Sequence, residues 1–437
     1  MSYRRCEMVP IAGVILGGLL MVSTAHAQQV TPSFGKEVAP ILKRSCTHCH
    51  RPGSIGPMAL ETFDQVRPWA RSIRNKVSNR EMPPWYIDKR VGIQQFNNDP
   101  SLTDAEIETI VKWIDAGAPA SDLAAVPAPR QSQGLDDVWQ FKPDKIVQLD
   151  KDVIVAAQAP DWWTDIVVDP GFTEDRWVKA IETKPSKGMR AVHHAATSVI
   201  EPDADGSGLP RGRLLNEYAL GKNADIYADG TARLIKAGSK ISFNLHLAAV
   251  GEETPANVSL ALQFYPRGYT PKYPIEFLNV AGSDLDIPPN TDNVRHDSYF
   301  TLIKPTRLLS FQPHMHNRGK AMCIEAILPG NGQGNIRQGN EILPISCVDR
   351  YQFAWHISYH YAEDVQPLLP AGTVLHITAW HNNTTSNRFN PDPDQHVTFG
   401  NRTVDDMGFA WLKLFYMTDE DYQQAVAARQ AQPVASN

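Results

Sequence analysis

The most specific chemical signature in the sequence is the stretch CTHCH, from Cys46 to His50. It has the C-x-x-C-H pattern, in which two thiols one helical turn apart each add to a vinyl group of haem. His50 then falls beneath the iron as its proximal ligand. A zinc half-site is the alternative, but zinc needs a second pair of nearby ligands, and none follows. We therefore predict a covalent haem c at Cys46, Cys49 and His50.

The sixth iron ligand is expected from a loop before the last helix of this region. Met82 lies in the stretch REMPPWY, where two prolines restrict themselves and the residues before them and so hold an extended loop. A thioether ligand raises the haem potential. Met58, in GPMAL, is the competing ligand. The position of the loop favours Met82.

Histidines outside this motif gather in segments that are typical of β-strands. His193 and His194 are adjacent, His246 is alone on a later segment, and His314 and His316 lie two apart in PHMH. Residues i and i+2 of a strand point to the same face, so the last pair can bind one ion. Adjacent strand residues face opposite ways, so the first pair can share an ion only at a bulge or a strand end.

Met407, in the stretch DDM before an aromatic strand, is a further metal-ligand candidate. A lone methionine is more often a core residue. Beside two histidines, however, its thioether would favour Cu(I), whereas imidazole suits copper in either oxidation state. Zinc fits less well because methionine is a poor zinc ligand. A blue-copper site needs a cysteine with histidines, and neither Cys323 nor Cys347 lies in such a pattern.

Taken in order, these residues resemble the ligand set of the copper type II, ascorbate-dependent monooxygenases, which include peptidylglycine α-hydroxylating monooxygenase and dopamine β-monooxygenase. The resemblance covers about residues 145 to 420. It implies two jelly-roll-type β-sandwiches, each holding one copper ion, with an open cleft between them. The implied ligands are His193, His194 and His246 for the electron-storing copper, and His314, His316 and Met407 for the copper where oxygen and substrate react.

The sequence departs from the peptide-amidating members at two positions. Their arginine two residues before the His-x-His pair is Gln312 here, and their tyrosine four residues after the copper methionine is Trp411. A peptide with a C-terminal glycine is therefore not the expected substrate, and Trp411 with Phe409 favours an apolar or aromatic one. Five other histidines are expected to be structural or to support the ligands: His296, His356, His360, His376 and His396. His381 is the exception, because it is expected near the cleft.

The first residues are typical of a secretory signal peptide, residues 1–27. A short basic start precedes the apolar run VPIAGVILGGLLMVS and the small-x-small cleavage signal AHA. An uncleaved anchor is the alternative. Later segments are too short or too polar to span a bilayer, so we expect no stable membrane insertion after cleavage. Bacteria attach haem c outside the cytoplasm, which agrees with a periplasmic location.

The composition is that of a globular protein with more than one core. The chain has 437 residues, 42% of them hydrophobic and 21% charged. A net charge of −6, without a basic stripe, argues against nucleic acid as a partner. Cys323 and Cys347 form an even pair in an exported chain, which predicts a disulfide.

The expected elements divide the chain. Helical spacing over 34–46, 61–79 and 102–119 predicts a small cytochrome c domain over 31–120. A linker rich in alanine, proline and glutamine follows over 121–137. Beyond it, short alternating runs separated by glycine and proline turns predict strands. The predicted fold class is multidomain: the small all-α cytochrome c domain, then two all-β jelly-roll-like sandwich domains over 138–285 and 286–425.

These features together predict an exported haem c and dicopper monooxygenase. It would hydroxylate a C–H bond of a small organic substrate with O₂. The fused haem would replace ascorbate as the electron donor to the copper bound by His193, His194 and His246. A periplasmic electron donor would in turn reduce the haem. One alternative is a periplasmic cytochrome c electron-transfer protein with a copper-binding β module and no turnover. A haem subunit of a larger dehydrogenase complex is another.

Overall fold

The computed structural model describes residues 31–52, 56–128, 139–202, 212–219, 224–282, 284–330 and 341–431. The signal peptide predicted for residues 1–27 lies outside the described residues, as do residues 129–137 of the linker predicted for 121–137. Within the described ranges, no helix has both the length and the apolar character that a membrane crossing requires.

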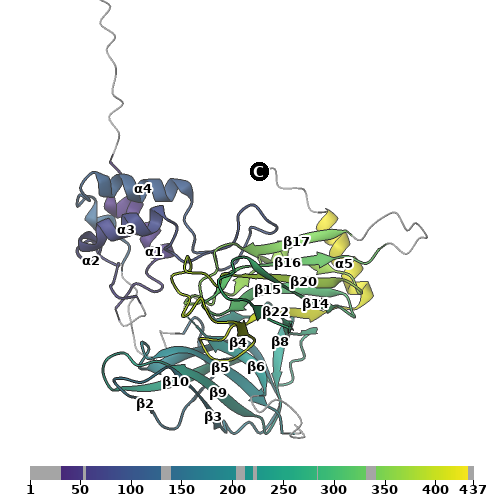
Figure 1. Cartoon of the computed structure of the whole chain (residues 1–437). Coiled ribbons are helices and arrows are strands. Elements are labelled where there is room, and N and C mark those ends of the chain that lie inside the picture. Colours follow the sequence, from purple (N-terminus) through teal and green to yellow (C-terminus); the bar gives the residue numbers. More distant parts are fainter. Residues whose placement is uncertain are drawn as a thin grey trace, which may run out of the picture.

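Short helices form the N-terminal part of the described chain and gather at one end of the molecule (Figure 1). Their apolar sides meet around Phe34, Ile110 and Trp113. Thr103 caps the longest of them, because its hydroxyl accepts the Glu106 N–H while the Glu106 carboxylate accepts the Thr103 N–H. The elements are a π-helical turn (Phe34–Val38), α1 (Ala39–Ser45), α2 (Phe63–Val66), a 3₁₀ turn (Arg67–Trp69), α3 (Ala70–Ser78), α4 (Asp104–Asp115) and a second 3₁₀ turn (Leu123–Ala125).

Two sheets that enclose a common core form what we term the first β unit. The outer, seven-stranded sheet contains β1 (Lys145–Gln148), β2 (Val153–Val155), β4 (Arg176–Lys187), β7 (Asp225–Ile226), β8 (Thr231–Ile235), β10 (Thr254–Phe264) and β11 (Tyr273–Pro274). The other sheet has the order β3 (Trp162–Val168), β9 (Lys240–Leu247), β5 (Val192–Ile200) and β6 (Arg213–Tyr218). This second sheet carries His193, His194 and His246.

A further pair of sheets and its core form the second β unit. One sheet contains β12 (Glu276–Ala281), β22 (Gly408–Tyr416), β15 (Thr306–Met315), β18 (Tyr359–His360) and β19 (Leu368–Leu369). The other has the order β14 (Val294–Thr301), β20 (Val374–His381), β16 (Gly319–Ile327) and β17 (Ile342–Val348). The remaining elements are β13 (Asp286–Ile287), β21 (Val397–Thr398), a 3₁₀ turn (Glu363–Val365) and the C-terminal α5 (Asp419–Ala431).

The predicted fold class, a small all-α cytochrome c domain followed by two all-β jelly-roll-like sandwich domains, is wrong. Strands account for 38% of the structure and helices for 16%, and the N-terminal helices do not close into an all-α domain. The stretch that follows α3 leaves them, and its apolar residues Trp85, Tyr86 and Ile87 are buried in the core of the second β unit. The helices keep a small core of their own, and the stretch that follows α3 is buried in the core of the second β unit.

The reason for this difference lies in the sequence MPPWYI. Pro83 and Pro84 cannot continue a helix, and three consecutive large apolar residues then need burial that the short helices do not provide. The sheet edge supplies it, because Ile87 forms a bridge with Val348. Helical periodicity on both sides of this stretch made it resemble an internal loop of a helical domain.

The disulfide predicted from the cysteine count is confirmed. Cys323 of β16 and Cys347 of β17 are directly opposite in the antiparallel register and are joined. The bond lies beside the point at which the N-terminal stretch attaches, since the Asp88 N–H donates to the Cys347 carbonyl at 2.8 Å.

Buried polar side chains tie the two β units together. Lys413 of β22 pairs with Asp225 of the first unit, and both are almost completely buried. The Gln312 amide of β15 donates to the Glu217 carboxylate of β6. A buried ion pair or a buried amide is tolerated only when its partners are present, so these contacts fix how the two histidine-bearing sheets face each other.

Candidate metal centre between the two β units

His193, His194 and His246 come together on neighbouring strands of the first β unit. His194 and His246 are directly opposite in the antiparallel β5–β9 pair, and the register shifts between Val192 and His194. That irregularity is the bulge that adjacent histidines need to point to one place. Because residues alternate along β9, Leu245 and Leu247 enter the core while His246 faces the second unit.

The three imidazoles converge through the same atom, Nδ1. His194 Nδ1 lies 3.2 Å from His193 Nδ1 and 3.4 Å from His246 Nδ1. Two nitrogens bound to one metal at about 2.0–2.1 Å and tetrahedral angles are roughly 3.3 Å apart. These two separations match that value, and the ligand atoms of all three histidines lie within 4.8 Å of one another, so the group could hold a metal ion.

Two neighbours hold His246 in the orientation that binding requires. Its Nε2 donates to the Asp161 carboxylate at 2.8 Å, which leaves Nδ1 with a free lone pair. The Asp161 carboxylate also accepts from the Thr403 hydroxyl of the second unit at 2.5 Å. Trp163, opposite His246 on β3, stacks on the imidazole at 4.2 Å between centroids. Sequence reasoning missed Asp161, because no local motif connects it to His246.

Burial keeps these histidines uncharged. It lowers the pKa of His193 to about 4 and that of His194 well below its usual value. Burial also lowers the pKa of His246, although the hydrogen bond that His246 donates to Asp161 acts in the opposite direction. All three are neutral at pH 7, which is the state in which imidazole binds a metal.

His314 and His316 lie on the face of β15 that points toward the first unit. Phe311 and Met315 of the same strand enter the core of the second unit, so alternation places the histidines on the opposite face, with their ring centroids 5.5 Å apart. Burial lowers the pKa of His314 well below its usual value. The two imidazoles predicted to share a face do share it.

A turn before β22 orients His316. Its Nδ1 donates to the Asp405 carbonyl at 3.1 Å, so Nε2 is the nitrogen free to bind a metal. Asp406 is completely buried and accepts from the backbone N–H groups of His316 and Arg318 at 2.8 and 3.0 Å. This carboxylate fixes the backbone from which the imidazole projects.

Met407 occupies the residue before β22, next to this turn. In the β15–β22 register His314 is opposite Phe409 and Met315 is opposite Gly408, which extends to Met407 opposite His316. Residues that are opposite one another in an antiparallel pair share a face. Met407 therefore starts from the same face as the two histidines, as the predicted ligand set requires.

His356 lies between the two histidine clusters, although its sequence context predicted a residue that is structural or supports the ligands. It lies on the loop between β17 and β18, with Phe353. Phe353 contacts His193 and His316 at 5.4 and 5.3 Å between centroids. The open cleft that the resemblance implied is filled at this point by an aromatic loop.

The departures noted at Gln312 and Trp411 lie on this same surface. Gln312 is bound to Glu217, and Phe409 stacks on His314 at 4.5 Å with Trp411 beside it at 5.1 Å. The wall of the second cluster is therefore aromatic.

Two other histidines support structure: His381 donates to the Met407 carbonyl at 3.0 Å, and His376 binds Glu325 and Asp297.

The C-x-x-C-H stretch has the local geometry that a covalent haem needs. Cys46 and Cys49 are free and partly exposed, and the His50 N–H returns to the Cys46 carbonyl at 2.9 Å. His50 Nδ1 donates to the Met58 carbonyl at 3.1 Å, which leaves Nε2 available for iron. The Met58 backbone thus lies next to Nδ1, and a ligand opposite His50 would have to approach from the side of Nε2, which disfavours Met58.

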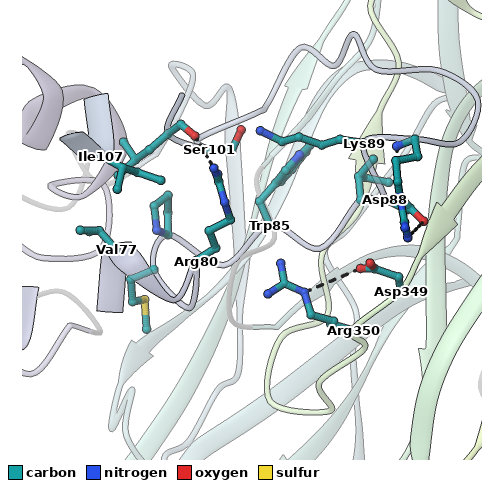
Figure 2. Close-up of a pocket in the computed structure, with 14 residues that line it drawn as sticks. Val77, Arg80, Trp85, Asp88, Lys89, Ser101, Ile107, Asp349 and Arg350 are labelled. Carbon is teal, nitrogen blue, oxygen red and sulfur yellow. Dashed lines mark hydrogen bonds and ion pairs between the residues drawn. The ribbon is translucent and has the colours of Figure 1, made fainter. Parts of the chain in front are cut away.

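Met82, the predicted opposite ligand, lines a cavity of about 240 Å³ between the helices and the second β unit. Figure 2 shows Val77 and Ile107 on the helical side of this cavity, Asp349 and Arg350 on the other, and Trp85 between them. Arg80 and Lys89 add positive charge to its wall. Cys46, Cys49 and His50 are not among the residues that line this cavity, so the cavity places Met82 without joining it to the haem-attachment motif.

Comparisons with known proteins give this chain no family. No protein-family model and no curated protein matches it. Among solved structures it is similar to the major capsid protein P2 of bacteriophage PM2, with a TM-score of 0.29 and 9% identity over 62% of this chain and 97% of that chain. PBCV-1 VP54, fitted into a reconstruction of the virophage Sputnik, has a TM-score of 0.21 and 10% identity over 64% and 96%. Similarities at these TM-scores carry no argument about fold or function.

Proposed function

We propose that this chain is an exported copper monooxygenase that hydroxylates a C–H bond of a small organic substrate with O₂, with a covalent haem c on the same chain as its source of electrons. The observation that carries the proposal is the convergence of three histidine Nδ1 atoms next to a second pair of buried histidines. Such a set of neutral imidazoles in a dry interface is suited to copper.

Cys46, Cys49 and His50 would hold the haem, with Met82 opposite. The first metal ion would be held by His193, His194 and His246, and the second by His314, His316 and Met407. When bound, copper supplies one-electron chemistry and a centre for O₂, and haem c stores one electron at a potential set by its axial ligands.

The chain's own groups prepare this site for that chemistry. Asp161 and the Asp405 carbonyl each hold a proton on the outer nitrogen of a histidine, so that the inner nitrogen can bind. Phe353 contacts His193 and Phe409 stacks on His314, which would limit the access of water to these imidazoles. A dry site strengthens the electrostatic interactions within it and limits side reactions of the substrate.

The position of the haem motif supports entry of electrons at the first cluster. Burial raises the pKa of Tyr218 to about 12, and charge on Cys49 adds to this increase, so Cys49 lies close to Tyr218. Tyr218 is opposite Ala195 in the β5–β6 register, and Ala195 follows His194. Cys49 therefore lies near β6, the edge strand of the sheet that carries the first cluster.

One observation favours a second candidate function, a periplasmic electron-transfer protein with a copper-binding β module and no turnover. Phe353 and His356 occupy the space between the histidine clusters, where a monooxygenase must admit a substrate. In that case the copper would exchange electrons with the haem without hydroxylating anything.

Two measurements on the mature protein test the proposal. In an anaerobic stopped-flow experiment, reduced haem should reoxidise when Cu(II) fills the protein. With apolar and aromatic substrates, ¹⁸O₂ should then give ¹⁸O-labelled alcohol, and Met407→Ala should abolish that product while sparing haem reduction. Haem that stays reduced beside Cu(II) contradicts the relay. Haem reoxidation without labelled alcohol from any substrate supports the electron-transfer alternative.

A further inference from the structure

The loop between β17 and β18 inserts one histidine between the two clusters. His356 is 3% exposed. Its ring centroid lies 4.9 Å from that of His314 and 5.6 Å from that of His194. Loops usually run over the surface of a protein, so a histidine held this deep by a loop needs an explanation.

The hydrogen bonding of the two ring nitrogens of His356 indicates its role. A hydrogen bond to the Phe353 backbone occupies one nitrogen, and the other, Nε2, is buried without a hydrogen-bond partner among the described residues. His314 Nδ1 is also buried without a hydrogen-bond partner among the described residues. Buried polar atoms are nearly always paired, so two unpaired imidazole nitrogens on neighbouring buried rings are candidates for binding an ion.

We propose that His356 is a ligand of the second metal ion and binds it through Nε2, together with His314 and His316. Two imidazoles that bind one ion at about 2.0–2.1 Å have ring centres roughly 5 Å apart at tetrahedral angles. The His314–His356 and His314–His316 centroid separations are 4.9 and 5.5 Å. The same range, 4.9 to 5.5 Å, is found within the first cluster.

The ring orientations assign His356 to the second cluster. Its ring is inclined by only 29° to that of His194, in a stacked arrangement, so a lone pair in the ring plane passes beside His194. Its ring is inclined by 76° to that of His314, which allows both lone pairs to meet at one ion. The first cluster already has three converging nitrogens and needs no further imidazole.

This assignment rests on the proposed function only in taking copper as the metal, and it changes the second site. Three imidazoles with Met407 would hold copper in both oxidation states, whereas two imidazoles and a thioether favour Cu(I). The metal would also tie the β17–β18 loop to β15, because His356 and His314 belong to different segments of the second unit.

The direct test uses the wild-type protein with ¹⁵N-labelled histidine imidazoles and Cu(I), which is diamagnetic. Long-range ¹H–¹⁵N spectra report which ring nitrogens bind. We expect the His356 Nε2 signal to shift with those of His314 and His316 as the second equivalent of Cu(I) binds. Shifts at His314 and His316 with an unchanged His356 signal would overturn the proposal.

A matched pair of variants gives an independent test. His356→Gln should weaken binding of the second equivalent of Cu(I) at least tenfold in competition titrations and leave the first equivalent unchanged. The control is His396→Gln, an exposed histidine paired with Asp286, which should change neither. Equal binding of both equivalents by wild type and His356→Gln refutes the proposal alone, whereas a wild type that binds no copper refutes the proposed function. If His356→Gln does not fold, the labelled wild type decides.

Discussion

The two histidine clusters are built in different ways. The first is formed by two neighbouring strands, β5 and β9, and its three nitrogens already converge on one point. The second has His314 on β15 and His316 directly after it, and it receives its other members from a loop and from the turn before β22. One cluster is completed by pairing within a sheet, and the other by segments that are distant in the chain.

Because of this difference, a side chain behind the first cluster can affect metal binding without affecting folding stability. The outer partner of the first cluster, Asp161, has a side chain that is 42% exposed, so it can be changed without disturbing a core. The partner of the second cluster, Asp406, is completely buried and accepts several backbone N–H groups. We expect changes near the first cluster to alter metal affinity and changes near the second to alter stability as well.

The largest expected effect is a dependence of stability on pH, because both clusters contain buried, neutral histidines. Burial lowers the pKa of His193 to about 4 and of His356 to about 3, and also lowers those of His194 and His314. Between the ordinary histidine pKa of about 6.5 and these values, the unfolded chain binds more protons than the folded chain. The free energy of unfolding of the metal-free protein should therefore fall as the pH falls from 7 to 5.

Urea unfolding of metal-free protein at pH 7 and pH 5 measures this effect. Several histidines contribute with the same sign, so the midpoint should decrease clearly. His193→Gln should make the decrease smaller, and His396→Gln should not change it. Equal midpoints at the two pH values would contradict the assignment of these histidines as neutral and buried.

Asp406→Ala should have the next largest effect. It leaves the His316 and Arg318 N–H groups without their acceptor and His381 without its nearby carboxylate. Loss of one partner of a buried charged network costs about 3–5 kcal/mol. Urea unfolding at pH 7 checks this. The matched change at the first cluster, Asp161→Ala, should leave the unfolding free energy of the metal-free protein nearly unchanged. Similar losses in both variants would remove the distinction between the clusters.

His246→Ala should abolish the first metal site and preserve the second. Removing a ligand should cost more affinity than the 10–100-fold that loss of a partner behind a ligand typically costs. Competition titration with Cu(I) should then give one tight equivalent in place of two. If both equivalents are lost together, the clusters form one cooperative site and the comparison drawn above is wrong.

Asp161→Asn should have the smallest of these effects. The amide keeps the size of the carboxylate but holds the His246 Nε2 proton less firmly, so the affinity of the first site should fall by about 10–100-fold. Thr403→Val removes the other hydrogen bond to Asp161 and should weaken binding less. An Asp161→Asn protein with unchanged copper affinity would mean that Trp163 alone orients His246.

The sequence predicted what short-range chemistry determines. Alternation along a strand placed His314 and His316 on one face, the bulge required for His193 and His194 is present, and Cys323 is joined to Cys347. The fold class failed at one stretch, Trp85 to Ile87, because the sequence does not reveal which core will bury an apolar run. The roles of Asp161 and His356 were missed because each meets its partners from a segment that is distant in the chain and carries no motif.

The most direct test of the account is the amount of copper per haem in the mature protein after reconstitution with copper, together with an EPR spectrum of the oxidised form. The account predicts two copper ions per haem, both with type 2 spectra. A protein that carries haem but binds no copper would contradict it, because the converging histidine nitrogens would then have a purely structural role.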